Sequence, residues 1–132
     1  MKKFIFLFIV TLFFLTACDK EDSNNSYKFK GTVEINQYPS GSNLSLEELA
    51  KPQYDSKIRF EAFIKDASGK LVENVSVSWG TKNILSNCIK YSSLNKMVVD
   101  VKEADFMPGN IIQVTASYGG VFSSSIMITF RE

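Results

Sequence analysis

A two-residue alternation of apolar and polar side chains runs through most of the chain after position 26. It is clearest in residues 57–65, where every second side chain from Ile58 to Ile64 is apolar. Successive side chains of a β-strand point to opposite sides, so this period predicts strands with one buried and one solvated face. Strands of this kind need a second apolar surface to cover the buried face. The chain is therefore expected to fold as packed β-sheets.

Seven segments carry this pattern and are bounded by Gly, Pro, Asn, Asp and Ser residues typical of turns. The predicted strands are residues 27–35, 57–65, 71–79, 84–91, 96–102, 111–118 and 122–130. Strands at such short spacing are typical of a single all-β sandwich. A flattened barrel has the same periodicity and remains the alternative architecture.

Three local features refine this prediction. Gly119 and Gly120 suit a two-residue hairpin loop, because both can adopt positive φ. The third predicted strand should turn Val75, Val77 and Trp79 inward. The last strand should turn Phe122, Ile126, Ile128 and Phe130 inward, because these residues are separated by even numbers.

One short segment, residues 44–50, is predicted to be helical. Ser45 and Glu48 have the spacing of a capping box, and Leu44 and Leu49 fit a hydrophobic staple around it. Pro52 ends the helix almost at once. We therefore expect a helical insert of one or two turns at an edge or end of the sandwich.

The first 17 residues have the layout of a secretory signal peptide. Two lysines precede an apolar run over residues 4–15, which is shorter than the roughly 20 residues that span a bilayer. The sequence Leu15-Thr16-Ala17-Cys18 resembles the lipobox of bacterial lipoproteins. This resemblance implies a diacylglyceryl group on the Cys18 sulfur, cleavage before Cys18 and acylation of the new amine. It implies a membrane partner through the lipid; an ordinary cleaved signal is the alternative.

The predicted organisation has three parts. Residues 1–17 are the signal peptide, residues 18–26 are the lipidated cysteine with a flexible tether, and residues 27–132 are the sandwich domain. The start of the tether, residues 18–22, resembles the export signal of certain Gram-negative surface lipoproteins.

That resemblance implies that Lys20, Glu21 and Asp22 direct the protein to the outer face of the outer membrane. A competing sorting rule reads Asp directly after the lipidated Cys as inner-membrane retention. A periplasm-facing lipoprotein is therefore the alternative localisation.

Composition argues against several classes of function. The chain has no His, which removes Ser-His-Asp and Cys-His catalysis and the commonest transition-metal ligand. Without residues 1–17 it keeps 13 basic and 14 acidic residues, so it offers no basic surface for nucleic acid. The acidic residues lack the spacing of a calcium loop, and no cofactor, metal or catalytic residue is predicted. Cys88 has no disulfide partner once Cys18 is lipidated, and we expect it to be buried.

Aromatic residues are the best candidates for ligand contacts. Phe63 lies on the polar side of the predicted strand 57–65, which leaves its ring available to a sugar or a protein, or else covered by the helical insert. Tyr38 and Tyr54 lie in predicted loops and are further candidates. Trp79 continues the apolar face of its strand, so it is expected in the core.

Two stretches, residues 62–79 and residues 112–120, resemble bacterial Ig-like domains of the invasin and intimin type. In the first, a strand ends at Asp66, turns at Gly69 and leads to a second strand that ends at Trp79. In the second, the penultimate strand leads into the Gly-Gly hairpin. The resemblance implies an Ig-like sandwich that serves as a spacer or an adhesive module, and it implies no catalytic residues. The chain departs from that family in its single copy and its helical insert.

These observations predict a membrane-anchored surface lipoprotein that is not an enzyme. Its domain is expected to be a binding or structural module in adhesion or envelope assembly, with a protein partner. The alternative is a glycan-binding accessory lipoprotein of an outer-membrane uptake system.

Overall fold

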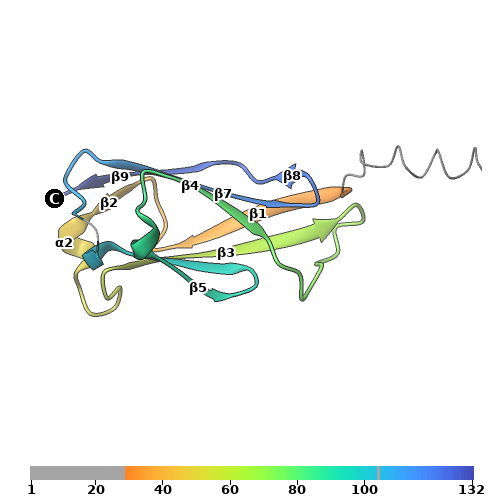
Figure 1. Ribbon diagram of the computed structural model, residues 1–132, viewed down its shortest axis with the longest axis horizontal. Helices are drawn as coiled ribbons and strands as arrows, with labels where there is room; N and C mark the ends of the chain where they lie inside the picture. Colours follow the sequence, from red (N-terminus) through yellow and green to blue (C-terminus); the bar gives the residue numbers. More distant parts are fainter. Residues whose placement is uncertain (1–28, 104) are drawn as a thin grey trace, which may run out of the picture.

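The computed structural model describes residues 29–103 and 105–132, and this part of the chain is an all-β sandwich, the predicted fold class (Figure 1). It contains nine strands within these residues, where the alternation predicted about seven. The elements, in order, are β1 (Gly31–Tyr38), β2 (Asn43–Ser45), α2 (Leu46–Leu49), β3 (Lys57–Asp66), β4 (Ser78–Lys82), η2 (Ser86–Cys88), β5 (Ile89–Ser93), β6 (Lys96–Asp100), η3 (Val101–Glu103), β7 (Ile111–Tyr118), β8 (Val121–Phe122) and β9 (Ile126–Arg131). None of the described helices is long and apolar enough to cross a membrane.

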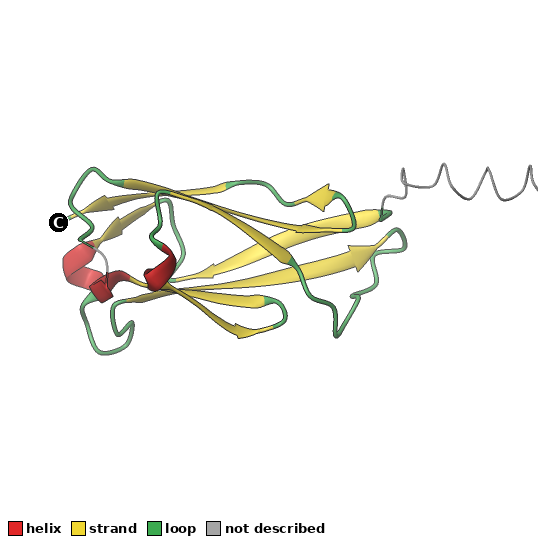
Figure 2. Ribbon diagram, in the orientation of Figure 1, coloured by secondary structure: helices red, strands yellow, loops and turns green. Residues whose placement is uncertain are grey.

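The strands form two sheets that lie one over the other, with the helical turns gathered at one end (Figure 2). Sheet A has the order β1-β3-β6-β5, and sheet B has the order β2-β9-β7-β4 with β8 beside β7. All the strand pairs are antiparallel except β2 with β9, which is parallel. The two sheets have no strand in common among the described residues, so the fold is the sandwich and not the flattened barrel.

The two longest central strands follow the alternation as predicted. Strand β3 buries Ile58, Phe60, Ala62 and Ile64 and leaves the residues between them at the surface or half-buried. Strand β7 likewise buries every second residue. Because each of these strands is paired on both sides, its register is fixed along most of its length.

The apolar interior divides into two clusters. The large core contains Leu44, Leu49, Ile58, Phe60, Met97, Val99, Val101, Ile112, Val114, Ile128 and Phe130. The small core contains Val33, Ala62, Ile64, Val77 and Ala116. Trp79 is half-buried and packs against both clusters, so its inward direction is as predicted.

The helical insert forms where it was predicted, at one end of the sandwich (Figure 1). The Ser45 hydroxyl accepts a hydrogen bond from the Glu48 backbone N–H at 3.1 Å, and it donates one to the backbone oxygen of Glu132 at 2.7 Å. The Glu48 carboxylate pairs with Lys51. Leu44 and Leu49 are both buried in the large core, as a hydrophobic staple requires.

Residues 71–77 do not form the predicted strand, because this segment crosses from one sheet to the other. Its beginning lies on sheet A, where the Val72 N–H donates to the Ile64 oxygen. At its end the Val77 N–H donates to the Leu94 oxygen, and β4 begins at the next residue. A segment that passes from one sheet to the other cannot keep hydrogen-bonded pairing with a single neighbouring strand. Val77 is nevertheless buried and Val75 is half-buried, as the pattern predicted.

Two further strand boundaries differ from the prediction. Residues 84–88 cross back from sheet B to sheet A through the turn η2, so β5 begins at Ile89. Cys88 is fully buried in that turn, as expected. Strand β1 continues to Tyr38, beyond the predicted end at position 35, because pairing with β3 supports it up to Arg59.

The prediction for Phe122 is wrong, since its side chain is 71% exposed. Strands β8 and β9 are separated by residues 123–125, and these three residues face only two residues of β7, Thr115 and Ala116. One extra residue in a strand inverts the alternation beyond it. Ser123 turns inward at this bulge, and its hydroxyl accepts the Ala116 N–H at 3.0 Å. Phe122 therefore faces outward although Ile128 and Phe130 are buried.

Candidate functional site

The predicted site residues fall into three groups: those outside the described residues, the two tyrosines, and Phe63. Cys18, Lys20, Glu21 and Asp22 lie outside the described residues. Tyr38 and Phe63 lie on neighbouring strands of sheet A. Tyr38 is in the last pair of the β1–β3 ladder, opposite Arg59, whereas Phe63 lies near the middle of the ladder, opposite Glu34. The structure therefore separates Phe63 from the two tyrosines.

Phe63 lies on the outward face of sheet A, opposite Glu34 of β1, and is half-buried. It lines a crevice of about 350 Å³ beside the crossing segment and the β5–β6 turn. Leu71 and Leu94 also line this crevice and are 48% and 55% exposed. The α2 helix contributes nothing to this crevice, so the expectation that the insert covers Phe63 is wrong.

The structure brings Tyr38 and Tyr54 together at the end of sheet A where β1 ends. Their ring centroids are 5.7 Å apart, and the ring planes are tilted by 49°. Tyr38 keeps 53% of its surface exposed, whereas Tyr54 packs partly against the large core. Tyr54 therefore supports the Tyr38 ring, and Tyr38 presents it to solvent.

A groove of about 800 Å³ extends from Tyr38 across β3 and β6. The strand register places six of its lining residues in two adjacent rows that cross three strands. One row is Tyr38, Arg59 and Val98, and the other is Asn36, Glu61 and Lys96. Directly paired residues of neighbouring strands project from the same face of a sheet, so the two rows form one surface. We call this surface the row groove.

The row groove is built on strands that pack against the large core. The residues that alternate with its rows on β3 and β6 are Phe60, Met97 and Val99, which are fully buried in the large core. At its margin, the Gln37 side-chain amide donates to the carbonyl oxygens of Pro39 at 2.7 Å and Gly41 at 2.9 Å. These bonds hold the loop after β1 against the groove. A binding surface on packed strands keeps its geometry better than one on loops.

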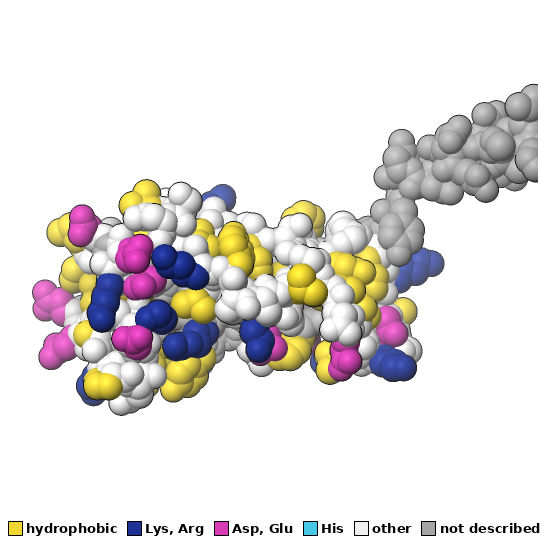
Figure 3. Space-filling view, turned by 60° about the horizontal axis from the view of Figure 1, so that its bottom comes forward, with side chains coloured by type: hydrophobic (Ala, Val, Ile, Leu, Met, Phe, Trp, Pro, Cys, Tyr) yellow, Lys and Arg dark blue, Asp and Glu magenta, His cyan; other side chains and the backbone are white. Residues whose placement is uncertain are grey.

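On the face shown in Figure 3, charged side chains are concentrated in the half of the molecule at the α2 end, where basic and acidic groups are mixed. Four carboxylates of the described residues, Glu34, Glu48, Asp55 and Glu103, form ion pairs. Lys90 pairs with Glu103 at 3.7 Å, and Lys51 pairs with Glu48 at 2.8 Å. Among residues 29–103 and 105–132, Arg59 and Lys96 form no ion pair. Within the described residues the row groove therefore holds two cations without an ion pair, with the Glu61 carboxylate on the same face opposite Lys96.

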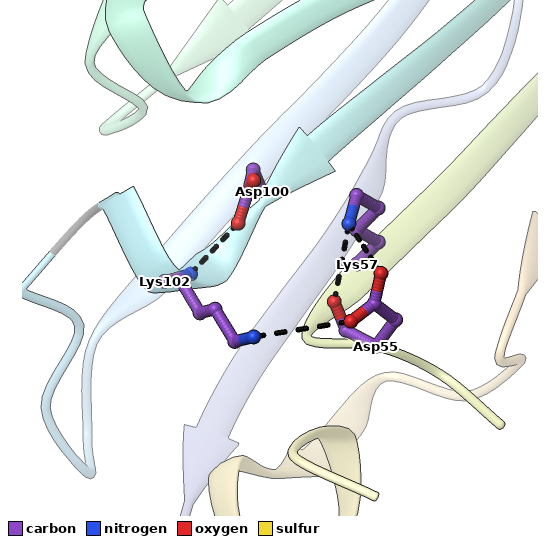
Figure 4. A network of polar contacts seen from close by, with 4 residues as sticks. All are labelled: Asp55, Lys57, Asp100 and Lys102. Atoms are coloured by element: carbon purple, nitrogen blue, oxygen red, sulfur yellow. Dashed lines mark hydrogen bonds and ion pairs between the residues drawn. The ribbon is translucent and has the colours of Figure 1, made fainter. Parts of the chain in front are cut away.

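Two other lysines, Lys57 and Lys102, contact acidic residues in a polar network beyond the Tyr38 row (Figure 4). The Asp55 carboxylate lies 2.7 Å from the Lys57 amine and 3.8 Å from the Lys102 amine. The Lys102 backbone N–H also donates to Asp100 at 3.0 Å. The hydrogen bond and charge of Lys57 lower the pKa of Asp55, so this carboxylate stays ionised beside both lysines.

The row groove has the chemistry of a binding surface. It combines an exposed aromatic ring, a side-chain amide, a carboxylate and two cations. No group of three or more Cys, Asp or Glu residues in the described part of the chain is arranged to hold a metal ion. Burial raises the pKa of the Cys88 thiol, with a further contribution from Glu103, so this group stays protonated near neutral pH.

Sequence reasoning selected Tyr38 but missed Asn36, Arg59 and Lys96. The outward position of Arg59 was predicted from the alternation in residues 57–65. Its alignment with Tyr38 depends on the register between β1 and β3, which the alternation does not specify.

In comparisons with known proteins, no family model, no curated protein and no solved structure matches this chain.

Proposed function

We propose that this protein is a membrane-anchored surface lipoprotein whose sandwich domain is a non-catalytic glycan-binding module. The observation that carries the binding function is the row groove, in which an exposed tyrosine lies beside polar and charged side chains on a rigid sheet. Sugar rings pack their apolar faces on aromatic rings, and their hydroxyls need hydrogen-bonding partners such as the Asn36 amide and the Glu61 carboxylate.

The orientation of the domain supports this proposal. The chain reaches the domain at Phe29, whose N–H donates to the Gly119 oxygen at 2.7 Å. Strand β1 then runs the length of the sheet and reaches the groove at Tyr38 (Figure 1). Eight extended residues span roughly 26 Å, at about 3.3 Å per residue. A lipid at Cys18 would therefore hold the Phe29 end near the membrane and present the groove away from it.

A second candidate function rests on the crevice beside Phe63. Leu71 and Leu94 are large apolar side chains exposed at its rim, and such patches are typical of protein contacts. This crevice favours a protein partner in adhesion or envelope assembly. It lies nearer to Phe29 along sheet A than the row groove does, and Glu61 lines both.

The anchor is tested with Cys18→Ser in cells that carry out lipoprotein processing. We expect the variant to appear in the soluble fraction or to remain uncut, while the wild-type protein stays with the membrane. A Cys18→Ser protein that remains membrane-bound at the processed mass would contradict the lipid anchor.

The sorting signal is tested by changing Lys20, Glu21 and Asp22 together to Ala. Added protease should degrade the wild-type domain on intact cells and spare the variant, because only the wild type should face outward. Both proteins should keep their lipid. If the wild-type domain is protected until the outer membrane is opened, the protein faces the periplasm.

The binding function is tested by screening the domain against immobilised oligosaccharides. Tyr38→Ala should abolish the captured signal, because the ring provides the stacking surface. Tyr91→Ala is the matched control, since Tyr91 is 63% exposed on β5 and does not line the groove. Equal binding by both variants would exclude the row groove as the site.

A further inference from the structure

The two free cations of the row groove occupy positions from which both reach one ligand group. Arg59 pairs with Val98 across β3 and β6, and Lys96 precedes Val98 by two residues on the same face. This makes Arg59 and Lys96 diagonal neighbours, about 7–8 Å apart at the backbone and within reach of each other's long side chains. Both residues are exposed. An anion between them would contact a planar guanidinium and an ammonium at once.

The aromatic ring lies next to this pair of cations. Tyr38 is directly opposite Arg59 in the register, so its ring and the guanidinium share one row. Directly opposite side chains are about 5 Å apart at their Cβ atoms, which is the width of one sugar ring. A sugar that packs on Tyr38 would therefore place a substituent of its ring at Arg59.

The second row supplies partners for neutral sugar groups. Glu61 lies opposite Asn36 on one side and Lys96 on the other, without an ion pair to Lys96 within the described chain. A carboxylate accepts hydrogen bonds from hydroxyls, and the Asn36 amide both donates and accepts. Asn36 and Glu61 therefore offer hydrogen-bonding partners for hydroxyls in the same row as Lys96.

We infer that the row groove binds an acidic saccharide, a sugar that carries a carboxylate, with the acid group held between Arg59 and Lys96 and the ring packed on Tyr38. This inference rests on the proposed glycan-binding function and specifies its ligand class. Asp55 and Glu103 are held by Lys57, Lys102 and Lys90. Glu61 lies opposite Lys96 without an ion pair in the described chain, so two cations and one carboxylate give the groove a net charge of +1.

The test compares oligomers of hexuronic acids, namely galacturonate, alginate and hyaluronan oligosaccharides, with their methyl esters. Esterification removes the charge and leaves the sugar ring unchanged, so each ester is a matched control. Affinities are measured by calorimetry on the purified domain. We expect at least one acid to bind, and its ester to bind about tenfold or more weakly, because two cations contact the charge.

Three variants sharpen the test. Arg59→Gln and Lys96→Met should each weaken binding of the acid about five- to tenfold and should leave any binding of the ester unchanged. Lys82→Met is the matched control, because Lys82 is an exposed lysine on β4 that does not line the groove. Binding of the acid should also weaken as salt is raised, since salt screens exposed charges.

The outcomes separate this inference from the function on which it rests. If neutral oligosaccharides or the esters bind as well as the acids and Tyr38→Ala abolishes that binding, the acidic ligand class is wrong and the glycan function stands. If neither acids nor esters nor neutral oligosaccharides bind, both are wrong. Binding of poly-glutamate with the same dependence on Arg59 and Lys96 would also overturn the inference, because it would show a general anion surface.

Discussion

The large core and the small core are shielded from solvent in different ways. The large core combines residues from both sheets with Leu49 of the helix, and nearly all its members are fully buried. The small core has no large side chain except Ile64 and is completed by half-buried residues such as Phe29 and Tyr118. These two rings meet edge to face at 5.0 Å. The large core is enclosed by paired strands and the α2 helix, whereas the small core is covered by Phe29, the crossing segment and the β7–β8 hairpin.

This difference explains where the candidate site is found. The row groove lies on strands β3 and β6 where their inward residues belong to the large core. The crossing segment that lines the Phe63 crevice instead borders the small core, through Val72 and Val75. We expect the groove to keep a fixed shape and the crevice to adjust, because residues 72–77 have few backbone hydrogen bonds to a sheet.

The largest effect is expected in the large core. Phe130 is fully buried and stacks on Phe106 at 4.6 Å, so Phe130→Ala should lower the free energy of unfolding by about 3–5 kcal/mol. Met127→Ala is the control on the same strand, because Met127 is 53% exposed. Urea denaturation of both variants measures the difference. A loss of similar size in the two variants would contradict the enclosure of the large core.

A charge in the small core should cost somewhat less, because the small core lies close to solvent. Val77→Asp places a carboxylate at a position that is 8% exposed, and we expect a loss of about 3 kcal/mol. Ser78→Asp, at the next and exposed position, should stay within about 0.5 kcal/mol of the wild type. Equal thermal stability of the two variants would show that this segment does not turn Val77 inward.

A smaller effect is expected at the bulge that lies over the small core. Ser123→Ala removes the hydroxyl that accepts the Ala116 N–H and leaves that buried group without its partner. The loss should be about 1–2 kcal/mol. The matched control is Ser124→Ala, since Ser124 is exposed. Hydrogen exchange at Ala116 provides a direct readout, because that amide should exchange faster in Ser123→Ala alone.

The smallest effect is a pH dependence of stability that comes from two carboxylates, one at each end of the sandwich. Hydrogen bonds from Ser68 lower the pKa of Asp66, and Lys57 lowers that of Asp55, both from an ordinary value of 3.8. A lowered pKa stabilises the fold above pH 3.8, and this contribution disappears as the pH falls through the lowered value. Asp66→Asn and Asp55→Asn should therefore melt below the wild type near neutral pH and approach it in acid. A difference in melting temperature that stays constant down to about pH 2 would show that the loss comes from the changed shape of the side chain and not from its charge.

Sequence reasoning succeeded where structure depends on neighbouring residues. It predicted β3, β7, the helical insert and the Gly119–Gly120 turn, whose glycines have φ of 57° and 83°. It failed at residues 71–77 and 84–88, where the chain changes from one sheet to the other. Of the candidate site it selected Tyr38 and Tyr54 but not the cations beside them.

The difference between what the sequence predicted and what it missed has a physical cause. Which residues can form strands and which side of a strand is apolar depend on composition and spacing within a few residues, so the alternation alone specified an all-β fold and the buried sides of β3 and β7. The outward position of Phe122 depends on one extra residue opposite Ala116, and the row groove depends on β1, β3 and β6 aligning Tyr38 with Arg59 and Val98. These alignments join segments far apart in the chain. Only the folded structure decides them, because register is a property of the pair of strands and not of either strand alone.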